Sequence, residues 1–204
     1  MAVSRLYEDG RIDDVRIQNF DGYKHQKNWM PWVRGEALGW VYGFQPMLVL
    51  RHDPQSDQAV EWKRWGLHAK LEQQRGGSQL IPWGNGWLCI THEAYVDSRS
   101  KRYLHRFLEL GSDFAPKKAS GSFYFESNTV EFCAGLCLSA DGKELVVSYG
   151  VDDRKAKLAR VPVEAVRKQL SIACHQTYSL PDPWEGREFG QHRTSGLRSR
   201  VSST

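Results

Sequence analysis

The residues best suited to chemistry lie together in one stretch, residues 75–106, which reads RGGSQLIPWGNGWLCITHEAYVDSRSKRYLHR. Its first five residues place two glycines between Arg75 and Ser78. Glycines let the backbone turn sharply or approach a ligand closely, and a guanidinium group binds anions through several donors. This segment therefore predicts a cradle for an anion or a sugar.

Two β-like runs follow the cradle and must position the remaining polar groups. WGNG at residues 83–86 is a turn signal, and residues 87–95 are rich in β-branched and aromatic types. After a polar connection, residues 103–110 form a second run of the same character. The two runs predict a β-hairpin that carries two histidines, one arginine and two glutamates.

Alternation along these strands sorts the polar residues onto two faces. Tyr103, His105 and Phe107 are expected on one face of the second strand, with Leu104, Arg106 and Leu108 on the other. His92 and Glu93 are neighbours in the first strand and therefore point to opposite faces. Only one of these two can face a given site, so the other is expected to pack or to meet solvent.

The length and composition of the chain indicate one folded domain, or at most two, and its net charge is small. The chain has 204 residues, 40% of them hydrophobic, and its net charge of +4 arises from 28 basic and 24 acidic residues that are interspersed. We therefore expect no nucleic-acid partner. No apolar run approaches the length of a membrane span, and the N-terminus lacks the apolar core of a signal peptide, so a cytoplasmic protein without membrane contact is expected.

The four cysteines do not show metal-ligand spacing. Cys89, Cys133, Cys137 and Cys174 each lie in an apolar context, and Cys133 and Cys137 are expected on one strand face. Buried, reduced thiols are the favoured interpretation. No metal and no cofactor are expected.

The rest of the chain predicts an all-β protein with one short helix near the C-terminus. Pro46 divides the most apolar run, residues 37–50, into a bulged strand or two strands. Dense turn signals such as ADGK at residues 140–143 indicate blades or a sandwich. Residues 1–178 form the predicted domain, and residues 179–204 are expected to be a disordered tail. Further strands are predicted at residues 58–73, 123–126, 130–138, 144–151 and 156–161, and the helix at residues 163–174.

Five motifs in order resemble a known family. KNWMPW, RGGSQLIPWGNGWLCITHEAY, YLHRF, VEFCAGL and VVSYGVDD, spread over residues 23–168, resemble the mannoside phosphorylases of glycoside hydrolase family 130. They are still more similar to related proteins often encoded beside or fused to glycosyltransferases. The resemblance implies a five-bladed β-propeller with its active site at the end of the central channel. Such enzymes cleave β-mannosides with inversion, and either phosphate or water is the nucleophile.

The same resemblance implies a set of binding residues. Lys27 matches the family's lysine, Arg75 stands where a lysine usually precedes a glycine-rich turn, and His92 matches the family histidine. Guanidinium and imidazole donors suit phosphate oxygens. The expected substrate- and phosphate-binding residues are Lys27, Arg75, Ser78, His92, Tyr103, Arg106 and either Asp152 or its neighbour Asp153.

Two departures from the family leave the catalytic residue unassigned. The family's general acid is an aspartate of N-terminal blades, whereas this chain is expected to supply about three blades. Residues 8–11, EDGR, lie too close to Lys27 to replace that motif, and they are interpreted as a solvated turn. Glu93 stands where the phosphorylases have glycine, which indicates a branch with different substrate recognition.

The sequence therefore supports two functions. The first is a carbohydrate-active protein that resembles mannoside phosphorylases or hydrolases and takes an oligosaccharide or glycosyl phosphate together with inorganic phosphate. The alternative is a non-catalytic glycan-binding or scaffolding module, since the eight tryptophans suit sugar stacking as well as a core. A partial propeller exposes strand edges, so either a homo-oligomer or a missing N-terminal half is expected.

Overall fold

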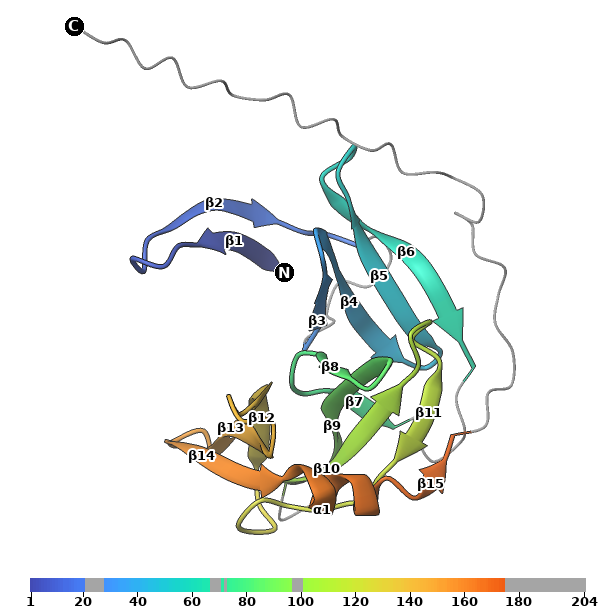
Figure 1. The fold of residues 1–204 in the computed structure, drawn as a ribbon, viewed down its shortest axis with the longest axis vertical. Helices are drawn as coiled ribbons and strands as arrows, with labels where there is room; N and C mark the ends of the chain where they lie inside the picture. The colour runs from blue at the N-terminus through green and yellow to red at the C-terminus, as the bar shows by residue number, and fades with distance from the viewer. Residues whose placement is uncertain (21–27, 67–70, 72, 97–100, 175–204) are drawn as a thin grey trace, which may run out of the picture.

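The computed structural model describes residues 1–20, 28–66, 71, 73–96 and 101–174, and β-strands make up most of them (Figure 1). The predicted all-β class is confirmed. The described residues form three antiparallel sheets in succession along the chain, preceded by a separate N-terminal hairpin. In these residues the three sheets form an open arc and do not close into a ring.

The first sheet is a four-stranded meander that begins just after Asn28. The apolar run at residues 37–50 forms two of its strands, because a turn at Gln45 and Pro46 reverses the chain. The strand-like pattern at residues 58–73 is confirmed only as far as Trp65. Its strands are β3 (Met30–Arg34), β4 (Ala37–Phe44), β5 (Met47–Asp53) and β6 (Gln58–Trp65), in that spatial order.

The second sheet contains the chemistry-rich stretch, and its long hairpin is confirmed. The register pairs His105 directly with His92, and Leu108 with Cys89. The hairpin turn predicted at Gly84 and Asn85 joins β8 to β9. The spatial order is β15, β11, β10, β9, β7, with β8 also pairing β9. The strands are β7 (Gln74–Gly76), β8 (Ile81–Trp83), β9 (Gly86–Val96), β10 (Lys101–Leu110), β11 (Pro116–Ala119) and β15 (Ile172–Ala173).

The third sheet is a three-stranded meander whose central strand alternates between buried and less buried residues. Every second residue of its central strand is buried, from Leu145 to Val151. Asp141 and Gly142 make the predicted turn, where Gly142 has φ +71°. Its strands are β12 (Glu131–Leu138), β13 (Glu144–Val151) and β14 (Lys155–Pro162), followed by α1 (Val163–Gln169).

Two apolar layers hold the three sheets together. Between the first and second sheets, Trp32, Trp87 and Phe114 pack ring against ring, with centroids of Trp32 and Phe114 4.9 Å apart. Between the second and third sheets, Ile90 and Phe107 pack against strands β12 and β13 and against α1. The middle of the second sheet is therefore covered on both faces, whereas Tyr95, Val96 and Lys101 at the ends of β9 and β10 are exposed.

The N-terminal hairpin consists of β1 (Ala2–Leu6) and β2 (Ile12–Ile17), and it lies outside this stack. Val3 and Phe20 pack against the far face of the first sheet, beside Trp40 and Tyr42. Residues 8–11 lie at the hairpin turn and are exposed, which confirms their interpretation as a solvated turn.

The strand predicted at residues 123–126 is wrong. Phe123 makes one bridge to His105, and the chain then leaves the sheet. The buried carboxylate of Glu131 accepts the backbone N–H groups of Phe125, Glu126 and Ser127 at 2.6, 2.9 and 2.9 Å. Donors bound to a carboxylate cannot pair with a strand, and this explains the irregular loop.

Replacing Glu131 by alanine should destabilise the fold strongly. The change leaves three N–H groups without an acceptor around a fully buried site, and we expect a loss of about 3 kcal/mol or more in the free energy of unfolding. Glu131→Gln keeps one acceptor oxygen and should lose less. Urea unfolding measures both, with exposed Glu164→Ala as the control, expected within about 0.5 kcal/mol of wild type. An equal loss in Glu131→Ala and the control would contradict this role.

Two further predictions need correction. The helix expected at residues 163–174 ends at Gln169, because Ile172 and Ala173 pair with β11 instead. Cys133 and Cys137 do not share a face: a bulge after Cys133 shifts the register, so Cys133 is buried and Cys137 is exposed. All four cysteines are free thiols.

Among the described residues, no helix is long and apolar enough to cross a membrane. The predicted tail at residues 179–204 lies outside the described part of the chain.

Candidate functional site

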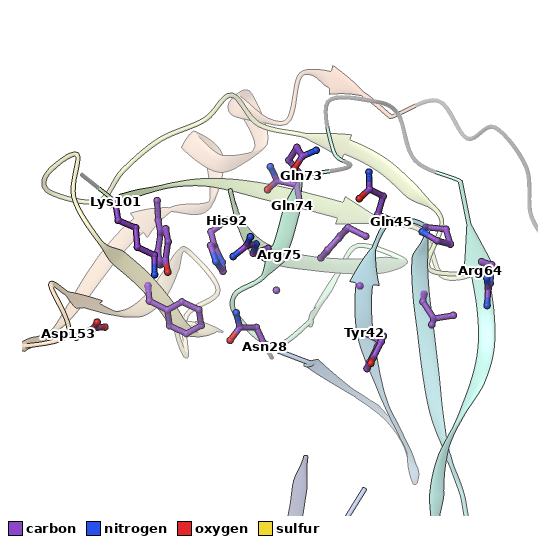
Figure 2. A pocket seen from close by; sticks show the side chains of 17 residues that line it. Asn28, Tyr42, Gln45, Arg64, Gln73, Gln74, Arg75, His92, Lys101 and Asp153 are labelled. Atoms are coloured by element: carbon purple, nitrogen blue, oxygen red, sulfur yellow. The ribbon is translucent and has the colours of Figure 1, made fainter. Parts of the chain in front are cut away.

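A pocket of about 790 Å³ lies where the three sheets meet. The turn between β4 and β5, strand β7, the β9–β10 hairpin, strand β12 and the loop after β13 all contribute to its lining (Figure 2). Residues from distant parts of the chain therefore converge on one space. Its lining is mixed, with cationic, amide and aromatic side chains.

Arg75 and Lys101 give one part of the pocket a positive character. Arg75 lies on β7 directly opposite His92 of β9, and its side chain is exposed. Lys101 begins β10 and stacks its ammonium group over Tyr103, 5.1 Å from the ring centroid. The pKa of His92 is lowered first by burial and then by the charges of Arg75 and, least, of Lys101. In the described lining Asp153 is the sole carboxylate.

His92 forms a neutral floor beneath these cations. Its side chain is 1% exposed, and burial followed by Arg75 lowers its pKa to about 4. The ring lies 4.8 Å from Tyr103 and 5.5 Å from Phe132, between centroids. Its Nδ1 has no hydrogen-bond partner among the described groups. This nitrogen is itself buried, so the neutral ring forms part of the wall of the pocket and does not present a free nitrogen to it.

His105 lies behind His92 and belongs to the core. The two ring centroids are 6.3 Å apart, and His105 packs among the rings of Phe123 and Phe125. It is fully buried, and burial followed by the nearby His92 lowers its pKa to about 4. Neither ring nitrogen has a partner in hydrogen-bond geometry within the described structure. His105 does not line the pocket.

Amide and aromatic side chains complete the lining. Asn28 lies beside β7, near Arg75 and His92, in Figure 2. Gln45 comes from the turn between β4 and β5, at the opposite end of the pocket from Lys101. The side chain of Gln74 is bound within the second sheet, since its amide oxygen accepts a hydrogen bond from Thr91 Oγ1 at 2.7 Å.

Three of the predicted binding residues, Arg75, His92 and Tyr103, come together in the pocket. Lys27 lies outside the described residues. Asp152 adopts φ +51° and donates its backbone N–H to the Val130 carbonyl, and the neighbouring Asp153 lines the pocket instead.

Ser78 and Arg106 lie away from the pocket lining and stabilise the second sheet. The Ser78 hydroxyl accepts the Ile90 N–H at 2.9 Å, and it is fully buried. Arg106 points to the opposite face from His92 and donates from Nη1 to the Ser120 carbonyl at 2.9 Å. Both residues use their polar groups within the scaffold.

Sequence reasoning missed Lys101, Gln45 and Arg64 as lining residues. Lys101 lies in the polar stretch between the two predicted strands, and Gln45 lies inside the apolar run at residues 37–50. Arg64 is bound to Glu61, with 2.6 Å between Nη2 and Oε2. No local pattern marks these three positions, because only the packing of the first sheet against the second brings them to the pocket.

No protein-family model matches this chain, and no curated protein is significantly similar to it.

Proposed function

We propose that the pocket binds an anionic carbohydrate, with a glycosyl phosphate or a sugar together with inorganic phosphate as the ligand class. The supporting observation is the convergence of Arg75, Lys101 and neutral His92 with Asn28 and Tyr103 in one space between three sheets. We further propose that the three sheets are blades of a partial five-bladed propeller, with the pocket at the end of its channel.

The lining suits both parts of such a ligand. Arg75 and Lys101 would hold the phosphoryl group, because charge-assisted hydrogen bonds to phosphate are short and strong. Asn28 and Gln45 offer amide groups to sugar hydroxyls, while Tyr103 and Phe132 offer aromatic surface. The volume of about 790 Å³ falls within the range of small-molecule pockets.

The reaction we propose is inverting transfer between a mannoside or related glycoside and phosphate. Such a reaction needs a general acid at the glycosidic oxygen and a cationic site for phosphate on the other face of the sugar. Arg75 and Lys101 would supply the cationic site. Asp153, the sole carboxylate of the described lining, is the first candidate for the acid.

The second candidate function is glycan binding without catalysis. A single specific observation favours it: the described lining has many cationic and amide groups but one carboxylate, Asp153, at its edge. A module of this kind would bind the same ligands and leave them unchanged.

The test combines binding with turnover. Mannose 1-phosphate is titrated calorimetrically into the wild-type chain and into Arg75→Ala, with Lys118→Ala as a control on β11 outside the pocket. Loss of a charged partner typically costs 2 kcal/mol or more, so Arg75→Ala should weaken binding about thirtyfold or more, and the control should not.

Phosphate release from the same ligand with a panel of sugar acceptors then separates the two functions. Acceptor-dependent release that disappears in Asp153→Asn and Arg75→Ala supports transfer. Binding without release supports the module. Equal affinity in wild type and Arg75→Ala would contradict both functions.

A further inference from the structure

Lys101 reaches the candidate pocket from the first residue of β10, and among the described residues no carboxylate forms an ion pair with it. Elsewhere in the described chain a lysine is bound to a carboxylate, as Lys157 is to Glu126. The Nζ atom of Lys101 lies instead over the ring of Tyr103, 5.1 Å from its centroid. The ammonium group is therefore oriented by an aromatic ring, and its charge stays available to an anion.

Tyr103 is itself held by strand pairing and by ring packing. The register of the β9–β10 hairpin pairs it with Ala94, and its backbone N–H donates to the Thr129 carbonyl at 3.0 Å. Its ring lies 4.8 Å from the ring of His92, between centroids. His92 is 1% exposed and packs against Phe132, so it cannot move away from Tyr103 easily. Tyr103 is therefore a rigid support for a flexible lysine side chain.

Strand geometry brings Lys101 to this ring. The two residues are two positions apart in β10, so they lie on the same face, with about 7 Å between them along the strand. Lys101 pairs with Val96 at the end of β9, where both residues are exposed and the sheet covers little of the lysine. A ring face attracts a cation within about 6 Å, and at an exposed site this favours the bound orientation about two- to fivefold.

We propose that Tyr103 is a positioning residue that acts through Lys101. The face of its ring holds the ammonium group in the pocket, so that the anionic group of a bound ligand meets two placed cations, Lys101 and Arg75. Figure 2 shows these two cations on either side of His92. This role rests on the proposed function, since it requires an anionic ligand in the pocket. A cation that is oriented before binding loses less conformational freedom on binding, and this raises affinity. The phenol hydroxyl of Tyr103 takes no part in the role.

The first test compares the affinity of mannose 1-phosphate for wild type, Tyr103→Phe and Tyr103→Leu by calorimetric titration. A phenyl ring keeps the face that attracts the cation, so Tyr103→Phe should bind within about twofold of wild type. Tyr103→Leu removes the ring face and should bind about fivefold more weakly. Lys101→Gln is expected to bind about tenfold more weakly or worse, and in that background Tyr103→Leu should cause no further loss.

A matched control lies on the opposite face of the same hairpin. Arg102 lies over the ring of Tyr95, with its Cζ 5.7 Å from the centroid, and neither residue lines the pocket. Tyr95→Leu removes the same kind of contact and should leave the affinity unchanged. Equal losses in Tyr103→Phe and Tyr103→Leu would show that the hydroxyl binds the ligand, and this overturns the proposal. A loss from Tyr103→Leu that persists in the Lys101→Gln background overturns it as well.

The second test measures the position of Lys101 by NMR without a ligand. A ring current shifts protons over a ring face upfield, so the ε-methylene protons of Lys101, assigned by their loss in Lys101→Gln, should resonate upfield of those of exposed Lys118. The shift should remain in Tyr103→Phe and disappear in Tyr103→Leu. An unshifted Lys101 in wild type overturns the positioning role. A ring-dependent shift in a wild-type chain that does not bind mannose 1-phosphate rejects the proposed function and supports the contact between Lys101 and Tyr103.

Discussion

Lowering the pH from about 6.5 to about 4 is expected to destabilise the folded chain by about 3 kcal/mol for each of His92 and His105. Both pKa values are lowered by burial from 6.5 to about 4. The unfolded chain therefore binds protons at these side chains in a pH range where the folded chain does not. The contribution of the two neutral histidines to the free energy of unfolding is complete above about pH 6.5. It decreases as the pH falls, and the decrease levels off below about pH 4.

His105→Phe isolates the contribution of one histidine. His105 packs among Phe123 and Phe125, and its ring nitrogens make no hydrogen bond of good geometry, although the backbone at Phe123 and Glu131 acts to raise its pKa. A phenyl ring therefore removes at most a weak contact with these backbone groups. We expect stability near that of wild type at pH 7 and greater stability by about 2 kcal/mol at pH 4.5. Urea unfolding between pH 4 and pH 7.5 measures the difference.

The control for this experiment alters the same cluster without removing a titratable group. Phe125→Leu should lower the free energy of unfolding by a similar amount at every pH, because it changes packing only. If the pH dependence of His105→Phe equals that of wild type, then His105 does not titrate in this range. The proposed burial of a neutral imidazole would then be rejected.

Gly76→Ala is expected to reduce both stability and ligand binding. A Cβ atom at Gly76 would lie 1.9 Å from the carbonyl oxygen of Asn28 and 2.8 Å from Met30. The backbone of Asn28 must therefore move away from β7, and this displaces an amide of the pocket together with the neighbouring Arg75. We expect a loss of about 2 kcal/mol or more in the free energy of unfolding, and at least tenfold weaker binding of mannose 1-phosphate.

Gly43→Ala provides a matched control in the same pocket. Gly43 also lines it, but a Cβ atom there meets nothing within 4 Å. We expect stability within about 0.5 kcal/mol of wild type and binding within threefold. Thermal unfolding and calorimetric titration are read for both variants. Equal behaviour of the two alanine variants would show that the close packing of β7 on Asn28 does not position the pocket.

The sequence alone determined the strands wherever alternating apolar and polar residues were bounded by typical turn residues. The pairs β8–β9, β9–β10 and β12–β13 follow from β-rich runs that residues 84–85, 97–100 and 139–143 separate in the sequence. The strand period also placed His92 and Glu93 on opposite faces. Arg75, His92 and Tyr103 were predicted from the resemblance of the motifs, and the register of β7, β9 and β10 brings the three residues together.

Only the tertiary structure decided which polar residues face the pocket and which serve the scaffold. Ser78 and Arg106 have the same chemistry as binding residues, but sheet packing directs them to backbone partners at Ile90 and Ser120. Lys101 and Gln45 come to the site from separate sheets, and such contacts between residues far apart in the chain leave no trace in local periodicity. The carboxylate of Glu131 lies only four to six residues from the N–H groups that it binds, but its burial beside them, which strand periodicity does not report, turns a predicted strand into a loop.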